Sequence, residues 1–189
     1  MLMLSPHHSA NEYPEPMTLD QKIEVFVDRI ESWQLDIARK VIEADIPNRE
    51  VALLYIVMNY FEMIGRYREG EMRAPTDAFK AGIKAVFPEI SGWSSDPSVS
   101  ETFLESLYGK VRSGLYHVGM PNPRVLFVNN DNVLSAAIGY YEPDRAFSIS
   151  SDILVRKIVE HFSGYVAELR NTANAKLRTI FERRYDSDN

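Results

Sequence analysis

The stretch VALLYIVMNYFEMIG, Val51 to Gly65, is apolar on nearly every side of a helical projection. Only Asn59 and Glu62 interrupt it. A surface helix has one apolar stripe, whereas a helix that is apolar all round is packed between neighbours. The stretch therefore predicts a central helix around which the other elements assemble.

Four more helices are predicted from apolar side chains that recur three and four positions apart. The first is capped by Thr18 and counts Trp33 and Ile37 among its core-facing positions. The last, if unbroken, would be roughly 50 Å long at 1.5 Å per residue, which exceeds the diameter of a domain this size. It therefore bends near Gly164 or Asn171, or packs its far half on a second subunit, and we favour the second subunit. The five predicted helices occupy residues 18–45, 51–65, 76–87, 98–119 and 151–184.

Short β-branched and aromatic runs lie between about residues 124 and 149, separated by the turn-forming residues NNDN and EPDR. They predict a small hairpin or a three-stranded meander. The predicted fold class is mainly α, a bundle of about five helices with this β insertion before the last helix. Residues 18–184 are expected to form one domain and 185–189 a tail. Residues 1–17 have three prolines and no periodicity, which predicts a flexible arm that is either disordered or loosely docked.

Composition excludes several classes of protein. The 189 residues suit one domain and include no cysteine, which rules out disulfides, catalytic thiols and cysteine-ligated metal centres. A net charge of −6 argues against a protein that coats nucleic acid nonspecifically, because such binding needs many Lys and Arg side chains. No apolar run reaches the roughly 18 residues of a membrane-spanning helix, and the start lacks a signal-peptide pattern. We expect a cytoplasmic protein with no membrane contact.

No metal and no cofactor are predicted, because neither HExxH spacing nor a glycine-rich phosphate loop occurs. His7 and His8 lie in the N-terminal arm, where a metal-binding role is not favoured. His161 borders the apolar stripe of the last predicted helix. A core or boundary histidine is the expected role there.

An arginine and a histidine lie close together at the end of the fourth predicted helix, in the stretch YGKVRSGLYHVGMP, Tyr108 to Pro121. Arg112 and His117 are five residues apart, about 140° around an ideal helix, so they can border one groove without sharing a face. Gly114 between them permits close approach of a neighbouring backbone. Histidine transfers protons near neutral pH and arginine stabilises a phosphorane, and together they suit a metal-independent ribonuclease.

A purely structural role is the alternative for this pair. A histidine in the last turn of a helix is favoured by the helix dipole, and a mid-helix arginine usually lies on a solvated face. Asn59 and Glu62 favour the functional interpretation, because a carboxylate on a largely buried helix needs a cationic or hydrogen-bonding partner. That partner is either on the Arg112–His117 helix or is Arg66, four residues after Glu62. The sequence does not separate the two pairings.

The run VRSGLYHVGMP, preceded by a helix such as ALLYIVMNYFEMIGRY and followed by a small β hairpin, resembles bacterial members of the HEPN superfamily (higher eukaryotes and prokaryotes nucleotide-binding domains). The family pattern is an Arg and a His separated by a few residues, here Arg112 and His117. The resemblance covers residues 108–121 as a motif and about 18–184 as an arrangement. It implies a helical bundle that forms a homodimer, with the two Arg–His helices facing each other across one cleft.

Catalytic members of this superfamily are metal-independent endoribonucleases, often toxins with a cognate antitoxin or defence proteins. The resemblance implies that Arg112 stabilises the transition-state phosphate and that His117 transfers a proton or orients the 2′-hydroxyl. Glu62 matches loosely the polar residue on the neighbouring helix. Ser113 departs from the pattern, because active members commonly have Asn, Asp or His there. This departure and the acidic charge favour the rival interpretation, a non-catalytic module that binds RNA, a nucleotide or a regulatory protein.

Overall fold

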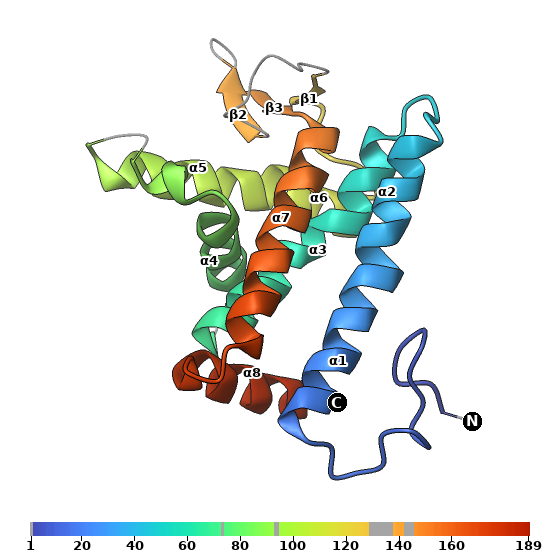
Figure 1. The fold of residues 1–189 in the computed structure, drawn as a ribbon. Helices are drawn as coiled ribbons and strands as arrows, with labels where there is room; N and C mark the ends of the chain where they lie inside the picture. The colour runs from blue at the N-terminus through green and yellow to red at the C-terminus, as the bar shows by residue number, and fades with distance from the viewer. Residues whose placement is uncertain (1, 73, 93–94, 129–137, 142–145) are drawn as a thin grey trace.

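The computed structural model describes residues 2–72, 74–92, 95–128, 138–141 and 146–189, and this part of the chain is mainly α-helical (Figure 1). The predicted fold class is confirmed. Two π-helical turns, η1 and η3, join consecutive α-helices without a break, and a 3-10 turn, η2, follows α4. The helical elements are α1 (Leu19–Ile30), η1 (Glu31–Leu35), α2 (Asp36–Glu43), α3 (Glu50–Glu69), α4 (Pro75–Val86), η2 (Pro88–Gly92), α5 (Pro97–Leu107), η3 (Tyr108–Ser113), α6 (Gly114–Val118), α7 (Ser151–Arg170) and α8 (Ala175–Asp188).

The central helix is α3, as its apolar sequence predicts. It packs against α2, α4, α7 and α8, so several sides of the helix are covered. It ends at Gly70, whose φ of 90° suits a residue without a side chain. Its fully buried side chains are Leu53, Leu54, Val57, Met58, Tyr60, Phe61 and Ile64.

Two glycines allow α3 and α4 to cross with their backbones in contact. A Cβ atom added to Gly65 of α3 would fall well inside 3.0 Å of the Ala78 carbonyl oxygen of α4. A Cβ atom added to Gly82 of α4 would meet the Phe61 carbonyl of α3 in the same way. Because backbone atoms cannot move aside like the end of a flexible side chain, each position accepts only glycine at this helix separation.

An aromatic cluster fills the space between α1, α3, α7 and α8. Phe26 of α1 lies at its centre, with its ring centroid 4.6 Å from that of Tyr67, 5.2 Å from that of Phe181 and 6.0 Å from that of Phe162. Each of these side chains is buried. The cluster therefore joins the first, central and last helices in one hydrophobic core.

The first predicted helix is continuous from Leu19 to Glu43, but the π turn η1 lies within it. A π turn inserts an extra residue and rotates every later side chain relative to the earlier ones. Leu35 is consequently buried, whereas Trp33 is 54% exposed and Ile37 is 43% exposed. The prediction that Trp33 and Ile37 face the core is wrong for this reason.

The last predicted helix is two helices, because the chain turns between Arg170 and Ala175. Asn171 leaves the helical conformation, with φ −74° and ψ 107°, and its side chain accepts a hydrogen bond from the Ala173 amide at 3.0 Å. Such a local bond from an asparagine side chain competes with helix continuation. Of the two predicted bending points, Asn171 is therefore the correct one, and α7 continues through Gly164.

The turn allows α8 to fold back on its own chain, where it contacts α1, α3 and α7 (Figure 1). The far half of the predicted helix, which we assigned to a second subunit, instead packs within the chain through Leu177, Phe181 and Tyr185. Helix length is thus no argument for a dimer. α8 also continues to Asp188, so the tail predicted at residues 185–189 is almost entirely helical.

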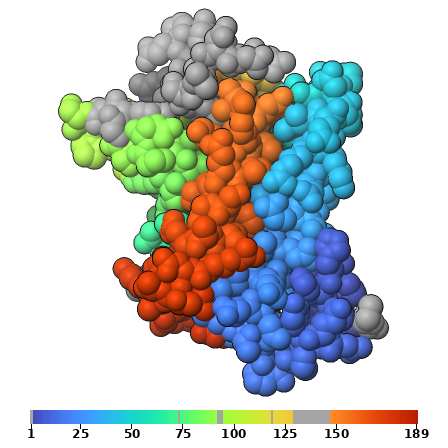
Figure 2. Space-filling view, viewed as in Figure 1, coloured from blue at the N-terminus to red at the C-terminus, as the bar shows by residue number. Residues whose placement is uncertain are grey.

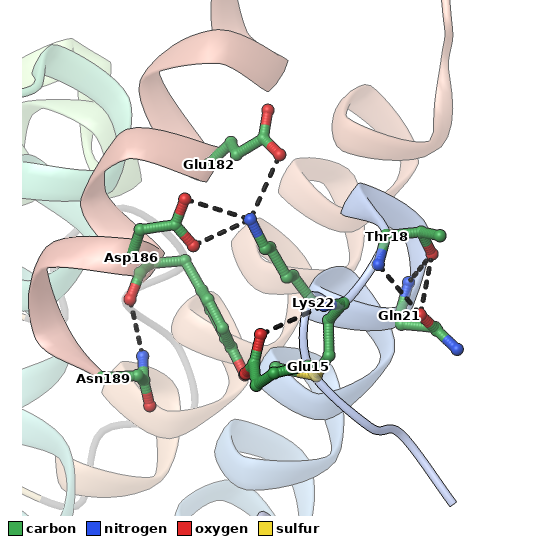
Figure 3. A network of polar contacts seen from close by, with 9 residues as sticks. Glu15, Thr18, Gln21, Lys22, Glu182, Asp186 and Asn189 are labelled. Atoms are coloured by element: carbon green, nitrogen blue, oxygen red, sulfur yellow. Dashed lines mark hydrogen bonds and ion pairs between the residues drawn. The ribbon is translucent and has the colours of Figure 1, made fainter.

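A nearly buried lysine fastens α1 to α8 (Figure 3). Lys22 is 8% exposed, and its Nζ donates to carboxylate oxygens of Glu182 at 3.1 Å and Asp186 at 3.0 Å. One turn earlier, Thr18 and Gln21 form the capping box that begins α1. Buried lysines need such partners, and here both are supplied by the helix that follows the Asn171 turn.

The N-terminal arm lies against α1, at the lower right of Figure 2. The His7 backbone amide donates to the Asp28 carboxylate at 2.8 Å, and the Arg29 Nε donates to the Leu4 carbonyl oxygen at 2.6 Å. Tyr13 donates to Glu24 at 2.6 Å. The arm is thus docked on α1 at several points along its length.

Three short strands lie between α6 and α7: β1 (Val125–Phe127), β2 (Ile138–Tyr141) and β3 (Ala146–Ile149). β2 and β3 pair antiparallel, which agrees with the predicted hairpin. β1 pairs parallel with β3, giving the order β1-β3-β2. The alternative of a meander, in which β2 would be central, is wrong. The turns predicted at NNDN (129–132) and EPDR (142–145) lie outside the described residues.

One hydrogen bond links a histidine of α7 to α3. The Tyr60 hydroxyl lies 2.7 Å from the His161 Nδ1, and burial lowers the pKa of His161 to about 4. The imidazole is therefore neutral at physiological pH. The interpretation of His161 as a core or boundary histidine is confirmed.

Replacing Gly82 with Ala should destabilise the fold by about 3 kcal/mol or more, because the new methyl group meets the α3 backbone. The matched control is Gly164→Ala on α7, where an added Cβ has nothing within 4 Å. That change should stabilise the fold by roughly 0.5–1 kcal/mol, because alanine has a higher helix propensity than glycine. Urea unfolding of both variants measures the difference. Similar effects of the two substitutions would contradict the glycine crossing.

Stability should fall as the pH drops from about 6.5 to about 4. In this window the unfolded state protonates His161 and the folded state does not, so protons favour unfolding by at most about 3 kcal/mol. His161→Gln retains a hydrogen-bonding side chain but does not titrate. The free energy of unfolding measured against pH should be less steep for this variant. Parallel curves would rule out His161 as the titrating group.

Candidate functional site

The Arg112–His117 motif lies in one long helical segment formed by α5, η3 and α6. The segment ends at Gly119, whose φ is 83°, as predicted. The chain then turns back, and the Asn122 amide donates to the Lys110 carbonyl oxygen at 2.9 Å. A Cβ atom on Gly114 would lie 3.0 Å from the Met120 carbonyl oxygen. The close backbone approach predicted at Gly114 is confirmed, and the approaching segment is the chain's own return.

Arg112 is held on three sides. Its Nη2 donates to the Glu62 Oε2 of α3 at 2.7 Å. Its Cζ lies 5.4 Å from the Tyr108 ring centroid and 4.9 Å from the Tyr116 ring centroid. Because the side chains of Arg112 and Glu62 are each only 18% exposed, this cross-helix ion pair is largely shielded from water.

Glu62 takes both of the partners that the sequence left open. Its Oε1 accepts from the Arg66 Nη2 at 3.2 Å, within α3. Its Oε2 accepts from Arg112 at the shorter distance of 2.7 Å. A carboxylate has two oxygens and can serve two guanidinium groups at once. Glu62 therefore connects α3 to η3.

Two tyrosines position α6 against α3. The Tyr55 hydroxyl of α3 donates to the Leu115 carbonyl oxygen at 2.7 Å, and the Tyr116 hydroxyl donates back to the Tyr55 carbonyl oxygen at 3.2 Å. Their rings meet edge to face, with centroids 6.0 Å apart. This reciprocal contact fixes the Tyr116 ring over Arg112. Tyr55, which belongs to the apolar stretch of the central helix, thus also orients the site.

Arg112 and Glu62 line a pocket of about 240 Å³ that we call the Arg112 pocket. Sequence reasoning had identified Asn59, Glu62 and Arg112 as site residues, and all three are present in it. It missed the contribution of α8, because that helix reaches the site only after the turn at Asn171. The pocket is lined by Asn59, Glu62, Met63, Arg66, Tyr67, Arg112, Arg184 and Asp188.

His117 is not in the Arg112 pocket. It is exposed on α6, and its side chain makes no hydrogen bond to the described part of the chain. The π turn η3 ends at Ser113, which is half-buried, so the helix between Arg112 and His117 departs from ideal geometry. The structure thus brings Arg112, Glu62 and Asn59 together and leaves His117 on a separate, solvent-facing surface of the same chain.

The described residues contain no group of three or more His, Asp or Glu side chains placed to hold a metal ion. In the same residues, no helix combines the length and the apolar character needed to cross a membrane. Comparisons with protein-family models, with curated proteins and with solved structures find no match for this chain.

We expect the Glu62–Arg112 pair to be coupled more strongly than the Glu62–Arg66 pair. Double-mutant cycles with Glu62→Gln, Arg112→Met and Arg66→Met test this by urea unfolding. The shielded cross-helix pair should have a coupling energy of about 1–2 kcal/mol, and the pair within α3 about 0.3–0.5 kcal/mol. Equal coupling energies would show that Arg112 gains nothing from its shielded position.

Proposed function

We propose that this chain is a HEPN-like protein that acts as a metal-independent endoribonuclease. One observation carries the proposal: a positioned arginine and an exposed histidine lie five residues apart on one helix. Cleavage of RNA by its own 2′-hydroxyl needs a positive charge beside the phosphorane and a group that transfers protons. Arg112 supplies the charge and His117 transfers the proton. No metal or cofactor takes part.

The proposed site is composite and is formed by two copies of the chain. His117 of one chain lies outside its own Arg112 pocket, so it is free to meet RNA at a surface that a second copy completes. Met120, which is 57% exposed, and Tyr116 provide apolar surface beside His117 for such a contact. A homodimer would then place two Arg–His helices around one RNA strand. We place the protein in the cytoplasm, where RNA is available.

A second candidate is a non-catalytic HEPN-like module that binds RNA, a nucleotide or a regulatory protein such as an antitoxin. The observation that favours it is the ion pair of Arg112 with Glu62, which neutralises much of the charge that catalysis would use. Ser113 favours it as well, because it replaces the Asn, Asp or His of active relatives. The acidic net charge is compatible with a protein partner.

The ribonuclease proposal predicts that purified protein cleaves single-stranded RNA in EDTA and leaves 2′,3′-cyclic phosphate ends. His117→Ala should reduce the rate about 100-fold or more, because proton transfer in the transition state is lost. His117 is exposed, so the variant should fold. His8→Ala, a histidine change in the arm, is the matched control and should cleave at the normal rate.

Cleavage products are resolved on sequencing gels, with identical preparation of all three proteins. Loss of cutting in His117→Ala alone supports the ribonuclease. Equal background from all three proteins would reject catalysis and leave the binding module. RNA affinity, measured by fluorescence anisotropy on the same samples, then tests the second candidate directly.

A further inference from the structure

The Arg112 pocket concentrates positive charge in an acidic molecule. Its lining includes Arg66 of α3, Arg112 of η3 and Arg184 of α8, against two carboxylates, Glu62 and Asp188. One positive charge is therefore in excess locally, although the whole chain carries −6. Three arginines converging from three separate elements are costly to place together unless something negative offsets them.

The guanidinium donors of the pocket are incompletely used. An arginine has five N–H donors. The Arg112 Nε is buried and has no hydrogen-bond partner among the described residues. Arg66 uses its Nη2 for Glu62, and Arg184 pairs with Asp188 through both its Nε, at 2.9 Å, and its Nη2. The remaining donors of Arg66 and Arg184 can therefore serve an acceptor that enters the pocket.

The pocket has room for a small ligand. Its volume of about 240 Å³ lies below the roughly 300–1,000 Å³ of pockets that hold drug-sized molecules. Besides the arginines, Asn59 offers amide donors and Tyr67 a hydroxyl at its wall. Burial, and then the negative charge of Asp188, raise the pKa of Tyr67, so this hydroxyl remains protonated at neutral pH.

We propose that the Arg112 pocket binds a phosphate group, with Arg66 and Arg184 as its principal ligands. Guanidinium groups match the oxygens of phosphate in pairs, which lysines do not. The proposed ribonuclease shares Arg112 with this pocket, but it uses neither Arg66 nor Arg184, and its His117 lies outside the pocket. The phosphate site therefore goes beyond RNA cleavage and would exist in a chain that cuts nothing.

Asp188 controls access to this site. Its carboxylate accepts from Arg184 within α8, four residues apart, and it is partly exposed near the end of the helix. An entering phosphate must compete with it for the Arg184 guanidinium. Replacing Asp188 with Asn frees that guanidinium and raises the net charge of the pocket lining from one positive charge to two. This substitution should strengthen phosphate binding.

Isothermal titration of the full chain with inorganic phosphate, in a low-chloride buffer at pH 7.5, tests the proposal. We expect one saturable site per chain. Arg184→Gln should weaken binding about 10-fold or more, and Asp188→Asn should tighten it several-fold. The matched control is Arg183→Gln, which removes the same charge from the neighbouring, exposed position of α8 outside the pocket. It should leave the affinity unchanged.

Absence of saturable phosphate binding in the unaltered protein would overturn the proposal. Equal weakening by Arg183→Gln and Arg184→Gln would also overturn it, because the effect would then be general electrostatics. A misfolded variant loses affinity, so tighter phosphate binding by Asp188→Asn could not be caused by misfolding. Phosphate binding without RNA cleavage would support this site and reject the ribonuclease. RNA cleavage without phosphate binding would support the ribonuclease and reject this site.

Discussion

The contact between the backbones of α3 and α4 is the constraint on which the other helices depend. Gly65 and Gly82 leave no room for a side chain, so the crossing fixes both the separation and the rotation of α3. With Phe61 and Gly65 turned toward α4, residues 59, 62 and 66 share a different face. That face meets η3 and α8. The rotation that buries the glycines thus also directs Glu62 to Arg112.

The second determinant is the turn at Asn171, which sends α8 back across the bundle. Lys22 and the aromatic cluster around Phe26 hold α8 in that position. As a consequence, Arg184 and Asp188 come to lie beside residues of α3 that are more than a hundred positions earlier in the chain. The Arg112 pocket is therefore a product of chain reversal, and so are its charge and its proposed affinity for phosphate.

The candidate site was partly predictable. Arg112 and Glu62 were identifiable because a charged residue inside an apolar helical pattern needs a partner, and the ion pair between them meets that need. Their relation to His117 was not predictable from spacing alone, because the π turn η3 contains Arg112 and changes the helical phase before His117 is reached. The same kind of turn, η1, explains why Trp33 and Ile37 are exposed where regular periodicity placed them in the core.

The sequence by itself determined the mainly α fold, the central position of α3, the helix end at Gly119 and the antiparallel pairing of β2 with β3. These features follow from local periodicity, capping and turn residues, which act over a few positions. Only the tertiary structure decided the parallel pairing of β1 with β3, the double pairing of Glu62 and the arrival of Arg184 in the pocket. These depend on which surfaces meet after the chain reverses, and contacts between distant segments have no local pattern to reveal them.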